Sequence, residues 1–131
     1  MYIRNVEILI HGHHIGLLSV CSLAVRLETI KYKPIHEQPL RARLIQSVPL
    51  SMLPGAVILA AKALDKAAQA WREALDKPDE PLDKLDEAWD EAEINFSRIC
   101  AVYKNELELL HLRLCVLDCP WDGERLIGIG D

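Results

Sequence analysis

The feature that most constrains this chain is a run of helical periodicity from Pro54 to about Leu117. In its first half, apolar residues recur at alternating steps of three and four, as on one face of a helix: Val57, Ala60, Leu64, Ala67, Trp71 and Ala74. The second half repeats the pattern: Leu82, Leu85, Trp89, Ala92, Phe96, Ile99 and Tyr103. Pro78 and Pro81 separate the two series, and proline either ends a helix or occupies its first position. Residues 54–117 therefore predict a long antiparallel helical hairpin.

The second helix of this hairpin is expected to extend beyond the first. After Tyr103 the apolar step lengthens by one residue, to Leu107, Leu110 and Leu114, which is typical of a stutter in a coiled coil. A continuous helix to Leu117 would be about 50 Å long, several turns longer than its neighbour. The excess must pack on the N-terminal third or on a second copy, so we expect a homodimer through this seam.

The N-terminal third predicts short strands. Residues 1–10 alternate in polarity and are rich in β-branched residues, which favours a strand, and Gly12 suits a hairpin turn. Residues 16–32 fit both a strand and a helical face. The strand is preferred because β-branched and aromatic residues cluster before Pro34.

Two further strands are predicted. Residues 40–48 suit an edge strand, because Pro49 cannot donate to a ladder of hydrogen bonds. Residues 124–129 follow an Asp122-Gly123 turn signal and could add a short strand to the N-terminal sheet. The chain is therefore predicted to be an α+β protein, with a small antiparallel N-terminal sheet packed on the helical hairpin. An all-α helical bundle, with residues 16–32 as a helix, is the alternative.

Length and cysteine content predict one cytoplasmic domain. A chain of 131 residues can bury a core of its own, so we expect a single domain over residues 1–131. Within it, residues 1–53 form a β meander and Pro-rich connection, 54–117 the hairpin, and 118–131 a turn and short strand. The four cysteines include no CxxC pair, and neither a secretory signal nor a membrane span is recognisable.

The charge of the chain is distributed unevenly. Residues 76–93 carry nine acids and two lysines, a local net of −7, whereas residues 1–50 carry six bases and three acids, a net of +3. We call the acidic residues of this stretch the acidic elbow: Asp76, Asp79, Glu80, Asp83, Asp86, Glu87, Asp90, Glu91 and Glu93. A solvated helix start is one interpretation, since acids favour that end of the helix dipole. The other is a surface that meets a basic partner, because like charges four residues apart repel.

The leading functional hypothesis follows from the acidic elbow. We expect a non-catalytic protein-interaction module, such as a small accessory or inhibitor protein, that engages a basic, nucleic-acid-binding partner. The expected partner-binding residues are Asp79, Glu80, Asp83, Asp86, Glu87, Asp90 and Glu91. Direct binding to duplex DNA is not expected, because the bases of the N-terminal third are diluted and the acidic elbow would repel a polyanion.

A histidine cluster is the first candidate for a metal site. Imidazoles two residues apart on a strand share a face, so His11 and His13 could bind one metal, beside His14 and with His36 or a carboxylate completing the site. The alternative is a solvated turn that contains histidine. The second candidate set, His111, Cys115 and Cys119, is spaced by four along one helical face and could bind zinc. Its alternative interpretation is a set of small buried side chains.

A catalytic function is the alternative hypothesis. It would be a small metal- or nucleotide-binding protein, or a metal-dependent hydrolase that uses the histidine cluster or the helical carboxylates. The chain has no Gly-rich phosphate loop, GxSxG or HExxH motif. We therefore expect no cofactor and no catalytic residue.

Overall fold

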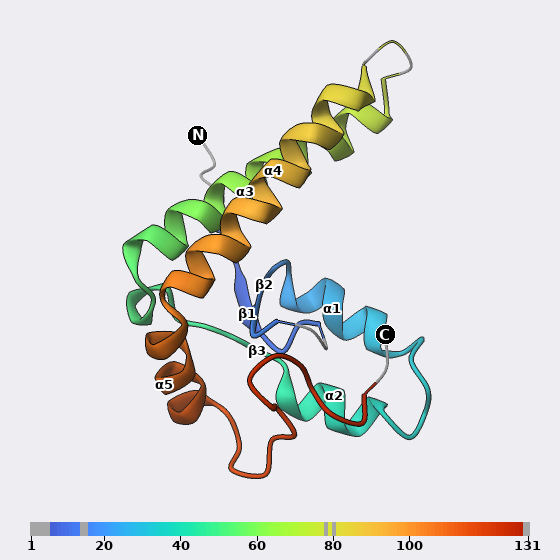
Figure 1. The fold of residues 1–131 in the computed structure, drawn as a ribbon. Helices are drawn as coiled ribbons and strands as arrows, with labels where there is room; N and C mark the ends of the chain where they lie inside the picture. The colour runs from blue at the N-terminus through green and yellow to red at the C-terminus, as the bar shows by residue number, and fades with distance from the viewer. Residues whose placement is uncertain (1–5, 14–15, 78, 80, 130–131) are drawn as a thin grey trace. The chain divides into compact units, whose positions relative to one another are not determined.

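The computed structural model describes residues 6–13, 16–77, 79 and 81–129 (Figure 1). The chain forms two compact units. The hairpin unit spans Leu53–Lys104, and the sheet unit joins Met1–Met52 to Asn105–Asp131. A small antiparallel sheet and several helices together confirm the α+β class.

The hairpin unit consists of two helices of equal length. They are α3 (Gly55–Leu75) and α4 (Leu82–Val102), which pack along each other as predicted (Figure 1). Val57 and Ala61 of α3 are fully buried. The rings of Trp71 and Trp89 are 5.2 Å apart. This contact joins the two helices near the end of the hairpin that holds their connection.

The predicted continuous second helix is wrong. Helix α4 ends at Val102, Tyr103 leaves helical geometry with φ −99° and ψ 22°, and α5 (Lys104–Leu114) follows. The lengthened step in the apolar pattern therefore marks a break between helices. From Asn105 onward α5 belongs to the sheet unit, where Leu107 and Leu110 are buried. The residues from Asn105 onward, whose excess length favoured a homodimer, pack within the sheet unit of the same chain. The homodimer stays a prediction.

The sheet unit contains three short antiparallel strands in the order β2-β1-β3. They are β1 (Ile8–Ile10), β2 (Leu18–Val20) and β3 (Gln46–Ser47). Leu9 lies opposite Ser19 on one side and Ser47 on the other. All three residues of β1 are buried, as expected for a central strand. The predicted N-terminal sheet and the hairpin around Gly12 are confirmed.

Most of the predicted strand over residues 16–32 is wrong, because β2 gives way to helix α1 (Leu23–Ile30). The side chain of Ser22 caps this helix by accepting a hydrogen bond from the backbone N–H of Val25, at 3.4 Å. The carboxylate of Glu7 accepts another from the N–H of Leu23, at 3.2 Å. The first N–H groups of a helix have no partner within the helix, and here two of them are satisfied by side chains. One of these side chains, that of Glu7, is distant in the sequence.

The strand predicted over residues 40–48 is also largely a helix, α2 (Gln38–Leu44), followed by the two residues of β3. Pro39 lies in the first turn of α2, where its missing N–H costs nothing. After a 3₁₀ turn, η1 (Leu50–Met52), the chain enters the hairpin unit.

The C-terminal segment does not join the sheet in the described part of the chain. An isolated bridge pairs Trp121 with Leu126 instead of the predicted strand over residues 124–129. The carboxylate of Asp122 accepts hydrogen bonds from the N–H groups of Glu124 and Arg125, both at 2.8 Å. This turn, signalled by Asp122-Gly123, therefore closes a local loop.

Among the described helices, none combines the length and apolar character required to cross a lipid bilayer.

Candidate metal centre

Four side chains with metal-binding atoms meet in the sheet unit. His11 lies in the β1–β2 connection, His111 in the last turn of α5, and Cys115 and Cys119 in the segment that follows. Their ligand atoms, one from each side chain, all lie within 4.8 Å of one another. Both histidines are buried and both cysteines are partly buried. The cluster thus joins the N-terminal and C-terminal parts of the sheet unit.

The backbone around His11 is unusual. His11 has a positive φ of 57°, in the left-handed region that a residue with a side chain seldom adopts. Its N–H donates to the carbonyl of Leu17 at 3.0 Å, and this bond holds the connection closed. At the next residue, a Cβ on Gly12 would lie 2.0 Å from Oγ of Ser19. A strained, tightly packed backbone of this kind is found where a side chain must be held in one place.

Helix α5 and its exit position the other three residues. The N–H of Cys115 donates to the carbonyl of His111 at 2.8 Å, which continues the helical hydrogen bonding by one residue. The side-chain amide of Gln46 donates to the carbonyl of Leu114 at 2.7 Å and so ties the end of α5 to β3. The N–H of Cys119 donates to the carbonyl of Val116 at 3.3 Å. The chain therefore turns between the two cysteines.

The interatomic distances suit a single metal ion. Nε2 of His11 lies 3.3 Å from Sγ of Cys119. Nitrogen and sulfur ligands at their usual distances from a tetrahedral Zn²⁺ are about 3.5 Å apart. The imidazoles of His11 and His111 meet edge to face, with ring centroids 5.0 Å apart. The largest separation within the cluster, 4.8 Å, requires an inward movement of about 1 Å for full coordination.

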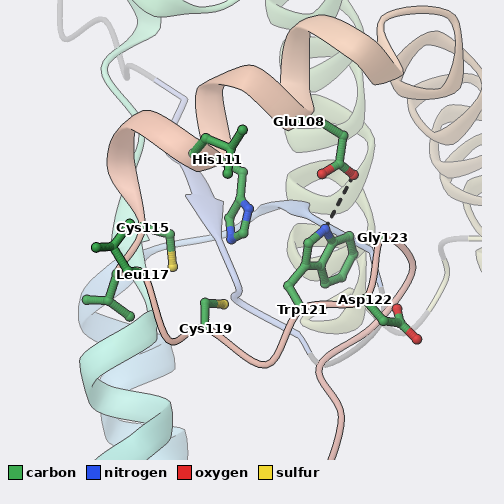
Figure 2. A pocket seen from close by; sticks show the side chains of 10 residues that line it. Glu108, His111, Cys115, Leu117, Cys119, Trp121, Asp122 and Gly123 are labelled. Carbon is green, nitrogen blue, oxygen red and sulfur yellow. Dashed lines mark hydrogen bonds between the residues drawn. The ribbon is translucent and has the colours of Figure 1, made fainter.

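Trp121 covers the two imidazoles. Its ring centroid lies 5.6 Å from that of His11 and 6.3 Å from that of His111. The indole N–H donates to the carboxylate of Glu108 at 3.3 Å (Figure 2). Glu108 lies one turn before His111 on α5, so this bond fixes the indole against the helix that carries a candidate ligand.

Each buried imidazole has a ring nitrogen without a hydrogen-bond partner in the described part of the chain. These atoms are Nδ1 of His11 and Nε2 of His111, in side chains that are 5% and 8% exposed. Buried polar atoms are almost always paired, because an unpaired one costs about 1–3 kcal/mol. Figure 2 shows the imidazole of His111 directed toward the two sulfur atoms. A metal ion would satisfy Nε2 of His111, whereas His11 would present Nε2, the nitrogen that faces Cys119, and keep its Nδ1 protonated.

The protonation states match those that metal binding requires of histidine. Burial, and to a smaller extent the neighbouring His111, lowers the pKa of His11 to about 4. Burial also lowers the pKa of His111, an effect that the charge of Glu108 opposes. Both imidazoles are therefore neutral at pH 7 and offer a free lone pair. For Cys115, burial and then the nearby thiol of Cys119 raise the pKa to about 11, so a bound cation would have to displace its proton.

A cavity of about 350 Å³ borders the cluster. Its walls include His111, Cys115, Cys119 and Trp121, and Glu108 lies at its edge (Figure 2). The cysteine side of the cluster therefore faces an opening, while His11 does not line the cavity.

The structure separates the members of the N-terminal histidine cluster. His11 is buried in the group of four, whereas His13 is exposed and does not take part in it. His14 lies outside the described residues. His36 is exposed, and its Nε2 lies 3.8 Å from the carboxylate of Glu37.

The members of the acidic elbow that the structure describes are all exposed. Glu80 lies outside the described residues. None of the ion pairs between described residues involves the acidic elbow. The carboxylates of α4 also form no metal-binding group within the described chain.

Sequence reasoning considered both halves of the cluster but did not combine them. His11 belonged to one candidate site, and His111, Cys115 and Cys119 to another. Nothing in their spacing signals that residues so far apart meet. The roles of Glu108 and Trp121 were also missed, although both lie within the same C-terminal segment.

Comparisons of the chain with protein-family models, curated proteins and solved structures found no match.

Proposed function

We propose that the sheet unit binds one Zn²⁺ ion through His11, His111, Cys115 and Cys119. The observation that carries this proposal is the approach of four ligand atoms to within 4.8 Å of one another. The unpartnered Nε2 of the buried His111 supports it independently.

The ligand set favours zinc over other ions. Two imidazoles and two thiolates form the usual tetrahedral environment of structural zinc sites. Mg²⁺ and Ca²⁺ prefer oxygen ligands, and the group of four contains none. Two thiolates would balance the charge of the cation. This balance offsets the desolvation cost of placing the ion in a partly buried site.

The proposed role of the ion is structural. Four protein ligands complete a tetrahedron and leave no position for a substrate. The ion would link the β1–β2 connection to the segment after α5, two regions that only folding brings together. Its binding free energy would therefore add to the stability of the sheet unit.

A catalytic thiol at Cys119 fits the geometry less well. A cysteine nucleophile needs a histidine that accepts its proton and a further group that stabilises the resulting imidazolium. Burial lowers the pKa of His11 to about 4, which disfavours that imidazolium. In the described chain its Nδ1 also lacks an acceptor that would hold it.

Metal analysis and cobalt substitution test the zinc proposal. Protein purified without chelator should contain one zinc per chain by elemental analysis. Co²⁺ in place of zinc should give the intense visible absorption of a tetrahedral site and a near-ultraviolet band from thiolate ligands. A chain that contains less than a tenth of an equivalent and does not bind added Zn²⁺ would refute the proposal.

The exposed acidic elbow favours a second function, as a non-catalytic interaction module. The exposed carboxylates of α4 repel one another, and no ion pair among the described residues offsets that cost. A basic surface would offset it, such as that of a nucleic-acid-binding protein. We propose that this chain is a small accessory or inhibitor protein of the cytoplasm that acts as a homodimer and binds its partner through this surface. Light scattering tests the dimer, and a partner-capture experiment tests the surface.

A further inference from the structure

We propose that Cys115 and Cys119 are a redox-active pair whose oxidation to a disulfide releases the bound metal ion. This inference rests on the proposed zinc site and adds a means of regulating it. It is carried by the position of the two sulfur atoms relative to each other and to the adjoining cavity.

The two thiols are close to each other. Their sulfur atoms lie within 4.8 Å of each other, and the presence of Cys119 helps to raise the pKa of Cys115. In Figure 2 both sulfur atoms lie beneath the imidazole of His111. A disulfide requires the sulfur atoms to approach to about 2.05 Å. The segment between them lies outside α5 and turns back at Val116, so it can adjust without unwinding the helix.

Small oxidants have a route to both sulfur atoms. Cys115 and Cys119 line the 350 Å³ cavity beside the cluster, and neighbouring Leu117 on its wall is fully exposed. The remaining cysteines, Cys21 and Cys100, do not line this cavity. Burial raises the pKa of Cys100 to about 11, as it does that of Cys115, but Cys100 has no proposed zinc ion beside it to hold it as the reactive thiolate.

The oxidation balances with hydrogen peroxide as the oxidant. The thiolate of one cysteine attacks a peroxide oxygen, which breaks the O–O bond and gives a sulfenic acid and hydroxide. The second thiolate attacks that sulfur, forms the S–S bond and displaces a second hydroxide. The two sulfur atoms together lose two electrons, which the peroxide oxygens accept. His11 and His111 alone then remain as ligands, and two imidazoles bind Zn²⁺ far more weakly than the full set of four.

The test uses the full chain with Cys21→Ser and Cys100→Ser together, so that any disulfide joins Cys115 to Cys119. Zinc-loaded protein receives one equivalent of hydrogen peroxide, and a chromogenic chelator measures the released metal. Peptide mapping identifies the disulfide, a non-reducing gel establishes that it lies within one chain, and wild-type protein is the matched comparison. We expect one zinc released for each intrachain disulfide, and rebinding after reduction with a phosphine.

The outcomes separate this inference from the zinc proposal. If the reduced protein binds no zinc, the proposed function fails, and the redox inference fails with it. If the protein binds one zinc and retains it under peroxide, only the redox inference fails. Release that accompanies sulfinic acids or disulfides between chains, without the Cys115–Cys119 bond, also overturns the inference.

Discussion

Nε2 of His11 lies 3.3 Å from Sγ of Cys119, although 108 residues separate them in the chain. Replacing either residue should weaken zinc binding strongly. We expect Cys119→Ser to raise the dissociation constant by more than the roughly 10–100-fold that loss of an outer-shell partner costs. Competition with a chromogenic chelator measures this constant. Cys100→Ser and His13→Ala are the controls, and equal weakening in a control would contradict the site.

Adding a methyl group at Gly12 should destabilise the sheet unit. The Cβ of Gly12→Ala would lie 2.0 Å from Oγ of the buried Ser19, so one of the two segments must shift. We expect the free energy of unfolding to fall by about 1–3 kcal/mol, measured by urea denaturation. Adding Ser19→Ala removes the colliding oxygen and should recover part of the loss. No recovery in the double variant would show that this contact is not the cause.

The zinc-free protein should lose stability as the pH falls from about 6.5 toward 4. The pKa of His11 is about 4 in the folded state, against about 6.5 when unfolded, so acid protonates the unfolded chain first. The contribution of neutral His11 to the free energy of unfolding is thus complete above pH 6.5 and is lost progressively below it. The expected slope from this residue is at most about 1.4 kcal/mol per pH unit. Urea titrations of wild type and His11→Gln with chelator present should diverge over this range, and parallel curves would exclude the effect.

The contact between Trp71 and Trp89 should stabilise the hairpin unit without affecting the metal. Their rings are 5.2 Å apart and partly buried. We expect Trp89→Ala to lower the free energy of unfolding of the hairpin unit by about 2 kcal/mol. Thermal denaturation followed by helical circular dichroism measures the loss. Zinc stoichiometry is the internal control, and its loss in this variant would mean that the two units fold interdependently.

Neutralising the acidic elbow should abolish capture of a basic partner. The variant replaces four exposed acids with serine: Asp83, Asp86, Asp90 and Glu91. Partner capture from a lysate, read by mass spectrometry, should be lost and should weaken with salt in the wild type, because charge attraction drives it. A matched control makes the same charge change elsewhere, at other exposed acids: Glu28, Glu73, Glu106 and Glu124. Unchanged capture by the elbow variant would exclude this surface.

The sequence was sufficient to predict elements governed by local periodicity. The apolar stripes of α3 and α4 bury their own faces, so their spacing alone predicted the hairpin. Helix α1 was mistaken for a strand because Val25 and Leu27 fit an alternating pattern, although both are exposed. Its start depends partly on the carboxylate of Glu7, a partner distant in sequence.

The candidate metal centre could be predicted only in fragments. Residue type and spacing made His111, Cys115 and Cys119 one candidate zinc set, but three ligands do not complete a structural zinc site. The fourth, His11, comes into place through the register of β1 with β2 and through the packing of the C-terminal segment. Those are tertiary contacts that no local pattern encodes.

The sheet unit is discontinuous, because the hairpin unit is inserted between Met52 and Asn105. Since α3 and α4 are antiparallel neighbours, the inserted module begins and ends at the same end of the hairpin. The candidate metal ligands all lie outside the insertion, so the hairpin can gain or lose whole helical turns at its far end while that set of residues stays intact. Hairpin length and elbow charge can therefore change independently of the constraint that the proposed metal binding would impose on the rest of the chain.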